Sequence, residues 1–381
     1  MTDVVVAVDG TPLFRRTDGI GRYASNVLRA TALARPDWRF VVVGLRPDAQ
    51  GPSLVPDLPN VEQVVVPLPR RWYQAACSFG LRVPVDRWVP RADVLLAMNF
   101  TDVPVLRGVP SVVTVFDLTY VDLPDVVEAR NLAHLRRAVP PAVRRARRVT
   151  TISPFTARRL GSALPGHAPV RLVDCGLDPS FLAPPLPGGP DLPERYVLAV
   201  GTLEPRKNLE TLLRAWALLD PALRADLRLV VVGRQGWGAD DVPDDVPAEV
   251  LDEVVLTGWV DDAHLPGVYA RAAAFVFPSL YEGFGLPLLE AMASGVPAVV
   301  SDIEPFREIG ADLVTYVPPR DPAAFADALA GVLRGPDAVR VAAARDRARG
   351  WTWERSGEQQ AAVLQEVLDA SGRAHEGTGH G

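Results

Sequence analysis

The chain has 381 residues, of which 48% are hydrophobic and 23% charged, and its formal net charge is −6 at pH 7. This length favours two domains, and the composition is that of an ordinary globular protein. No apolar run approaches the ~20 residues that span a bilayer. Cys77 and Cys175 have neither disulfide nor metal spacing. Because a strand-like VVVAVDG follows Met1 without a basic leader, no signal peptide is expected, and we expect a cytoplasmic protein.

Charge is divided unevenly along the chain. Residues 1–190 contain 23 Arg and 16 Asp plus Glu, which gives +7, so the remainder carries −13. A basic N-terminal half could attract an anionic acceptor or lie peripherally on an anionic membrane, such as the inner membrane face. The alternative is a solvated arginine-rich helix. Nucleic acid is not expected as a partner, since no recognised binding motif accompanies the charge.

The chain opens with a predicted parallel strand at Val4–Asp9, followed by a glycine pair, Gly19 and Gly21. This pair formally matches the dinucleotide fingerprint. However, the loop from Asp9 to Gly19 is too long for the tight turn which that fingerprint requires, and no ribose-binding acid ends the next strand. A glycine loop that begins a helix can still contact a phosphate or a sugar.

Strands and helices alternate through the rest of the first half, which predicts an open, mostly parallel sheet covered on both faces. Pro140-Pro141 should kink or split the second helix. Strands are predicted at 39–45, 61–68, 93–98, 111–117, 149–153 and 170–174, and helices around 20–34 and 126–148.

The second half repeats this pattern, which predicts a second sheet domain. Strands are predicted at 196–201, 227–233, 254–260, 274–277 and 296–301, and helices at 209–219, from about 262, at 288–293, 321–333, 337–349 and 351–368. The predicted organisation is a first domain at 1–181, a Pro- and Gly-rich linker at 182–194, a second domain at 195–350, a C-terminal helix at 351–370 and a disordered tail at 371–381.

The stretch Ala274–Asp302 is predicted to form a strand, a glycine loop, a helix and a second strand. The start of a helix after such a loop favours an anion. Two carboxylates flank this position, Glu282 in the loop and Glu290 one turn into the helix. A ligand that carries both phosphates and hydroxyls would use both kinds of group. The alternative is that Glu282 and Glu290 are a loop charge and a solvated helix residue.

Lysine usage singles out one further residue. Of the 40 basic residues 39 are Arg, and Lys207 is the one Lys, in the turn TLEPRKN before a predicted helix. A compact ammonium group binds a phosphate as a point charge, which a planar guanidinium does not reproduce. The alternative for Arg206 and Lys207 is an exposed basic turn that caps the helix.

Two motifs, GTLEPRKNLETLLRA and YEGFGLPLLEAMASGVPAV, resemble the signature of glycosyltransferase family 4, and GIGRY, VVTVFDL and TISPFTARRL support the resemblance. The resemblance implies an α/β protein of the GT-B architecture, with two Rossmann-like parallel-sheet domains that face each other across a cleft. It also implies that the last helix crosses back to the first domain. Family members transfer a sugar with retention and use no essential metal or other cofactor.

The resemblance also implies roles for individual residues. Arg206 and Lys207 would bind the diphosphate of the donor and stabilise the leaving group. Glu282 would contact hydroxyls of the donor sugar, and Glu290 those of the ribose. Phe116 and Asp117 would contact the acceptor or the sugar, although Phe116 replaces a histidine usual in the family and Asp117 could equally cap a loop. The remaining expected donor contacts are Gly19, Gly21, Gly201, Gly233, Trp259, Val260, Gly283, Phe284, Gly285 and Leu286.

The sequence therefore predicts a retaining hexosyltransferase that uses a nucleoside diphosphate sugar. GDP-mannose is favoured, with dTDP- and UDP-sugars as alternatives. The acceptor would be a glycan, a lipid-linked glycan or a glycosylated natural product. Two other classes stay open: a nucleotide-sugar epimerase, which would need acid and base residues, and a non-catalytic sugar-nucleotide-binding subunit. A dehydrogenase is disfavoured, because the dinucleotide fingerprint at Gly19 and Gly21 is malformed.

Overall fold

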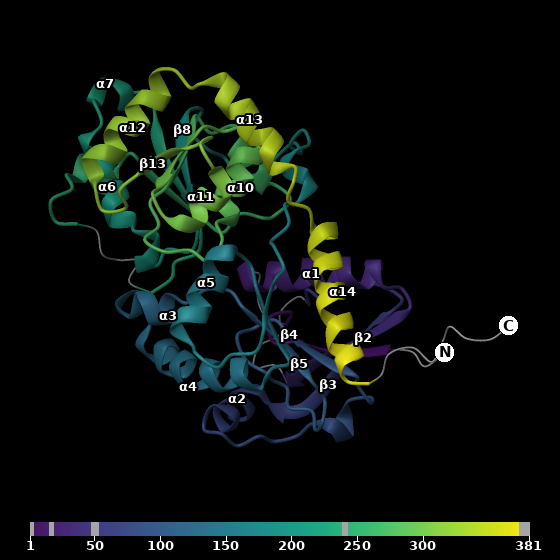
Figure 1. Ribbon diagram of the computed structural model, residues 1–381. Coiled ribbons are helices and arrows are strands. Elements are labelled where there is room, and N and C mark those ends of the chain that lie inside the picture. The colour runs from purple at the N-terminus through teal and green to yellow at the C-terminus, as the bar shows by residue number, and fades with distance from the viewer. Residues whose placement is uncertain (1–3, 15–18, 47–52, 238–242, 373–381) are drawn as a thin grey trace. The chain divides into compact units, whose positions relative to one another are not determined.

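The computed structural model describes residues 4–14, 19–46, 53–237 and 243–372. The chain forms two compact units (Figure 1). The N-terminal unit contains residues 1–122, 129–176 and 352–381, and the C-terminal unit contains 123–128 and 177–351. Among the described residues, no helix is both long and apolar enough to cross a membrane.

The N-terminal unit is a seven-stranded sheet in the order β3-β2-β1-β4-β5-β6-β7, with every pairing parallel. The chain order reverses between β1 and β4, as in a doubly wound sheet. Its elements are β1 (Val4–Asp9), α1 (Gly19–Ala34), β2 (Trp38–Arg46), β3 (Val61–Pro69), α2 (Arg70–Ser78), β4 (Val94–Ala97), β5 (Ser111–Val115), α3 (Thr119–Asp122), α4 (Ala129–Arg145), β6 (Arg148–Thr151), α5 (Pro154–Ala163), β7 (Val170–Leu172) and α14 (Trp353–Ala370).

The C-terminal unit is a six-stranded parallel sheet in the order β10-β9-β8-β11-β12-β13, which again reverses at its first strand. Its elements are β8 (Tyr196–Val200), α6 (Leu209–Leu218), α7 (Pro221–Arg224), β9 (Arg228–Val232), α8 (Ala248–Leu251), β10 (Val254–Gly258), α9 (Leu265–Ala270), β11 (Ala274–Phe277), α10 (Leu286–Ala293), β12 (Ala298–Ser301), α11 (Glu304–Gly310), β13 (Thr315–Val317), α12 (Pro322–Arg334) and α13 (Ala338–Ala348).

Apolar strands buried on both faces explain why each sheet needs helices on both sides. All four residues of β4 and of β11 are buried. In the C-terminal unit, Trp216 of α6 and Phe325 of α12 are completely buried against this sheet. The predicted fold class, two Rossmann-like parallel-sheet domains, is confirmed.

The C-terminal helix α14 is part of the N-terminal unit and packs along α1 (Figure 1). The two helices approach closely at Gly357, where a Cβ atom would lie 2.5 Å from the carbonyl carbon of Ala30. Glycine is therefore required for this packing distance. An ion pair also holds α14 against this unit, because Arg148 of β6 pairs with Glu366 of α14 at 3.0 Å.

The structure departs from the predicted elements at several places. One α-helix runs through Pro140 and Pro141 without being split. The carbonyls that lose their N–H partners belong to Arg136 and Arg137, which are exposed and can bind water instead. The strand predicted to reach Val260 ends at Gly258, whose φ of 68° turns the chain.

Two predicted segments fall partly outside the described residues. The loop before Gly19 includes residues 15–18, and the predicted disordered tail includes 373–381. The predicted linker at 182–194 contains no helix or strand and belongs to the C-terminal unit.

Candidate active site

The candidate site of the C-terminal unit lies where its parallel strands end. The central pair β8 and β11 is the point at which the sheet order reverses, and ligands bind open α/β sheets at such points. The segment after β8 carries Arg206 and Lys207, and the segment after β11 carries Glu282. Topology alone therefore brings these three residues to one edge.

Two glycines allow the loops at this edge to approach each other. A Cβ atom on Gly233, just after β9, would lie 1.8 Å from the carbonyl oxygen of Gly201, just after β8. Gly201 itself has a φ of 152°, and a Cβ there would lie 3.2 Å from Lys207 Cε. Both positions therefore need glycine for the loops to lie this close together.

Asn208 fixes the turn that carries the two cations. Residues Pro205–Lys207 form one 3-10 turn, and Asn208 follows in the left-handed region at φ 59°. Its side-chain amide donates to the carbonyl of Pro278 at 3.0 Å and to that of Pro319 at 2.6 Å. The turn after β8 is thereby attached to the loop after β11.

Glu282 lies between Arg206 and Lys207. Arg206 Nη1 donates to its Oε2 at 2.7 Å, and Lys207 Nζ donates to its Oε1 at 2.5 Å. Ser279 Oγ also donates to Oε1 at 2.8 Å. Arg206 Nε pairs in addition with Glu204 at 2.6 Å. The carboxylate thus holds both cations at fixed positions, and neither is the freely exposed basic turn of the alternative interpretation.

Burial and charge act in opposite directions on this cluster. Burial raises the pKa of Glu282, but the charges of Arg206 and Lys207 and the hydrogen bonds outweigh it and lower the pKa to about 2. Burial and the neighbouring Arg206 lower the pKa of Lys207, and Glu282 opposes that shift. The 2.5 Å contact is that of an ammonium with a carboxylate, and Lys207 Nζ also lies 4.9 Å from the centre of the Phe277 ring.

Helix α10 begins in the loop that follows β11. Gly285 precedes it with a φ of 126°, and a Cβ there would lie 2.9 Å from Phe306. Glu290 is only 2% exposed, so it is not a solvated helix residue. Its Oε2 accepts a hydrogen bond from the hydroxyl of Tyr269 in α9 at 2.9 Å. The carboxylate of Glu290 is therefore held inside the fold by a hydrogen bond rather than by solvent.

The other residues predicted for this unit surround the same strand ends. Trp259, just after β10, is half exposed, and Arg234 lies over its ring at 5.8 Å. Val260 and Phe284 are buried, as is Gly283, and Leu286 is half-buried at the first position of α10.

Of the four residues predicted in the N-terminal unit, Phe116 and Asp117 contact other parts of that unit. Phe116 is buried, with its ring 5.1 Å from that of Tyr23 and 5.5 Å from that of Phe100. Asp117 Oδ1 accepts a hydrogen bond from the N–H of Thr119 at 2.9 Å, which begins α3. Gly19 is exposed at the first position of α1, with open space around it, and Gly21 is buried.

Sequence reasoning missed three residues that support the cluster: Ser279, Asn208 and Tyr269. Ser279 precedes Glu282 by three residues, a spacing that permits a side-chain contact within a loop. Asn208 directly follows Lys207, and asparagine is favoured among non-glycine residues in the left-handed region. Tyr269 carries no local signal, because its contact with Glu290 spans 21 residues.

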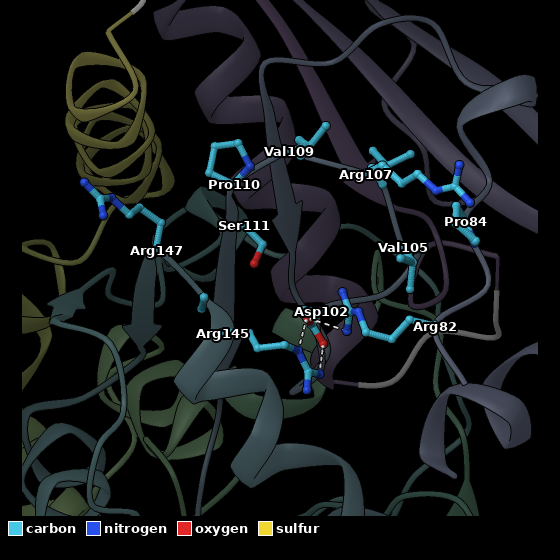
Figure 2. Close-up of a pocket in the computed structure, with 13 residues that line it drawn as sticks. Arg82, Pro84, Asp102, Val105, Arg107, Val109, Pro110, Ser111, Arg145 and Arg147 are labelled. Carbon is cyan, nitrogen blue, oxygen red and sulfur yellow. Dashed lines mark hydrogen bonds and ion pairs between the residues drawn. The ribbon is translucent and has the colours of Figure 1, made fainter. Parts of the chain in front are cut away.

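A cavity of about 640 Å³ lies elsewhere, in the N-terminal unit, and none of the predicted site residues lines it (Figure 2). In the part of the chain that the structure describes, no group of three or more His, Cys, Asp or Glu could hold a metal ion.

Comparison of folds defines the class of the protein. Sucrose-phosphate synthase from Thermosynechococcus elongatus superposes with a TM-score of 0.73 at 20% identity, covering 96% of this chain and 100% of that one. The Anabaena protein HepE, solved with UDP and glucose, superposes with a TM-score of 0.65 at 17% identity, covering 95% of this chain and 99% of that one. The chain therefore has the GT-B fold class.

Sequence comparison identifies a family match in the C-terminal unit. Residues 194–335 match the family model described as glycosyl transferases group 1. The chain is 38% identical over 167 residues to O-antigen chain mannosyltransferase B from Escherichia coli, which covers 42% of each chain. The chain spans about two fifths of the length of such curated relatives.

Proposed function

We propose that the chain is a retaining hexosyltransferase whose C-terminal unit binds a nucleoside diphosphate sugar. The observation that carries this proposal is the cluster of Arg206, Glu282 and Lys207 at the ends of β8 and β11. The family match supports it, since it covers these three residues.

In this proposal Arg206 and Lys207 bind the diphosphate of the donor. As the bond between the anomeric carbon and the diphosphate oxygen breaks, negative charge grows on that oxygen, and the two cations stabilise it. The acceptor hydroxyl attacks the anomeric carbon from the face that the diphosphate leaves, within an ion-pair-like transition state, so the configuration is retained. The proton of the acceptor hydroxyl is transferred to the departing phosphate oxygen. No metal is needed, because the two side chains supply the positive charge.

Glu282 has two parts in this proposal. Its ion pairs hold the cations in place before the donor arrives, which lowers the cost of organising them during the reaction. A carboxylate offers about four lone-pair directions, and the structure uses three of them, for Arg206, Lys207 and Ser279. The remaining direction can accept a hydrogen bond from a hydroxyl of the donor sugar.

The rest of the donor is assigned to residues around the same strand ends. Glu290, with Tyr269 on one of its oxygens, would accept hydrogen bonds from the ribose hydroxyls. Backbone N–H groups of residues 283–286 would contact the sugar and the phosphate. The loops at 233–237 and 259–260 would enclose the base. Contacts from Gly19, Gly21, Phe116 and Asp117 stay predictions.

GDP-mannose is the favoured donor, because the motif GTLEPRKN is of the mannosyltransferase-like form and an identified relative is named a mannosyltransferase. The proposed acceptor is a hydroxyl of a glycan, a lipid-linked glycan or a glycosylated natural product. We also propose peripheral contact of the basic N-terminal unit with an anionic membrane.

A panel of nucleotide sugars tests the proposal, first by thermal shift and then by slow hydrolysis of the donor. The test variants are Lys207→Ala and Glu290→Gln. The matched controls are Arg334→Ala and Glu249→Gln, which change exposed residues. Turnover should fall by about 10²–10³-fold in the first pair and stay unchanged in the second. Wild-type turnover in Lys207→Ala would remove the site assignment, and donor isomerisation without acceptor would favour an epimerase.

A further inference from the structure

The cavity of the N-terminal unit opens at the edge of the sheet where β5 begins, because Ser111, the first residue of β5, lines it (Figure 2). In a parallel sheet this edge is opposite to the carboxyl ends of the strands. Asp117, which follows β5, belongs to the other edge. The cavity is therefore distinct from the edge at which substrate contacts are predicted in this unit.

Four arginines and one acid line the cavity, which leaves a formal charge of +3: Arg82, Arg107, Arg145, Arg147 and Asp102. The buried Asp102 lies between two of them, and pairs with Arg82 at 2.9 Å and with Arg145 at 2.8 Å (Figure 2). This pairing fixes two guanidinium groups in the wall. No ion pair joins Arg107 or Arg147 to another of the described residues.

An apolar surface adjoins the cavity. Trp72 and Phe79 are 78% and 72% exposed, and their spacing of seven residues places them on one face of α2 and its C-terminal cap. Leu81 and Val83, which flank Arg82, are 63% and 40% exposed. These four side chains form the apolar segment. Single exposed apolar residues are common, whereas a concentration of exposed apolar side chains is typical of an interaction surface.

Tyr73 joins the apolar segment to the cavity. Its hydroxyl donates to the carbonyl of Val83 and accepts from the N–H of Val105, both at 2.8 Å, and Val105 lines the cavity. Helix α4 adds charge beside α2, since the Arg137 guanidinium lies 4.7 Å from the centre of the Phe79 ring. Residues 70–85 and α4 together contain eight arginines and no acidic residue.

We infer that the cavity and the apolar segment form a second ligand site, which binds the phosphate headgroup of an anionic lipid at a bilayer surface. Arginine forks match phosphate oxygens, and the apolar segment would enter the interface between headgroups and acyl chains. A small soluble phosphate would have no use for the exposed aromatic side chains. This inference gives residues to the proposed membrane contact and does not depend on donor binding.

Vesicle co-sedimentation of the full chain tests the site, with phosphatidylcholine vesicles that either contain or lack phosphatidylglycerol. The variants are Arg107→Ala and Leu81→Ser. Their matched controls in the C-terminal unit are Arg334→Ala and Leu256→Ser, where Leu256 is 59% exposed. We expect binding only to the anionic vesicles, and a loss of about five-fold for Arg107→Ala, the equivalent of about 1 kcal/mol per basic residue. Leu81→Ser should also weaken binding, and both controls should bind like the wild type.

Two results would overturn the inference. One is equal binding of wild type, both variants and both controls to the anionic vesicles. The other is that glycerol phosphate protects residues 82–84 from hydrogen exchange while the protein binds no vesicles. Thermal shift with GDP, measured on the same samples, separates the two proposals. If the protein fails to bind vesicles but GDP still shifts its melting temperature, only the lipid site is ruled out. If GDP no longer shifts the melting temperature, the result concerns the donor site.

Discussion

Replacement of Glu282 by glutamine should destabilise the C-terminal unit, because it leaves Arg206 and Lys207 side by side without their shared carboxylate. The magnitude follows from the pKa of Glu282, which falls from 4.5 to about 2 in the folded chain. A shift of about 2.5 units corresponds to roughly 3 kcal/mol of stability at pH 7. The side chain is buried, so solvent screens this energy little.

The pH dependence of the stability difference tests the direction of the pKa shift. Since the folded-state pKa lies below the unfolded one, the stabilisation is fully present above pH 4.5 and is lost as pH falls towards 2. The difference between wild type and Glu282→Gln should therefore shrink from about 3 kcal/mol at pH 7 to about 1 kcal/mol at pH 3. Below the folded-state pKa the two proteins should be equally stable.

The assay is urea unfolding followed by pulsed hydrogen exchange of the peptide that contains β11, because this readout reports on the C-terminal unit alone. The exposed Glu249→Gln serves as the control and should show no difference at either pH. A difference below about 1 kcal/mol at pH 7 would contradict a buried, stabilising role of Glu282, because exposed ion pairs already account for that much. So would a difference that does not change with pH.

Three further changes test the supports of the site. Gly233→Ala should cost about 1–3 kcal/mol, because its Cβ would lie 1.8 Å from the Gly201 carbonyl oxygen; thermal unfolding should show Gly331→Ala, which has open space in α12, to be neutral or more stable. Tyr269→Phe should cost about 1–3 kcal/mol by removing the hydrogen bond to Glu290, and an unchanged urea midpoint would argue against that bond. Asn208→Gly should lower the stability less than Asn208→Ala, since glycine tolerates the φ of 59°. Equal losses of stability for the Gly and Ala variants would attribute the whole effect to the two side-chain hydrogen bonds.

Local patterns predicted most of the fold. Short apolar runs bounded by glycine and proline identify the strands, and the alternation with helices predicts parallel sheets. Helix α2 was missed because it follows β3 directly, and Pro69 at its N-cap makes no side-chain hydrogen bond. No start signal separates the two elements.

The site was predictable only as far as the chemistry is local. Lys207 stands out by composition, and Glu282 and Glu290 by their places around a helix start. Their partners are set by the tertiary structure, as with Tyr269, and a buried aromatic cluster around Phe116 cannot be read from the segment VVTVFDL alone. The arginine cavity was missed for the same reason, since its wall combines residues 82, 84, 102, 105–111 and 145–147.

Hydrogen exchange of the full chain with GDP, UDP and dTDP is the decisive test of whether a nucleoside diphosphate binds at the ends of β8 and β11. We expect at least one of the three nucleotides to protect residues 201–208 and 282–290 from exchange, and we expect this protection to be lost in Lys207→Ala. Protection that is absent from both segments, or that persists unchanged without the lysine, would contradict binding at these strand ends.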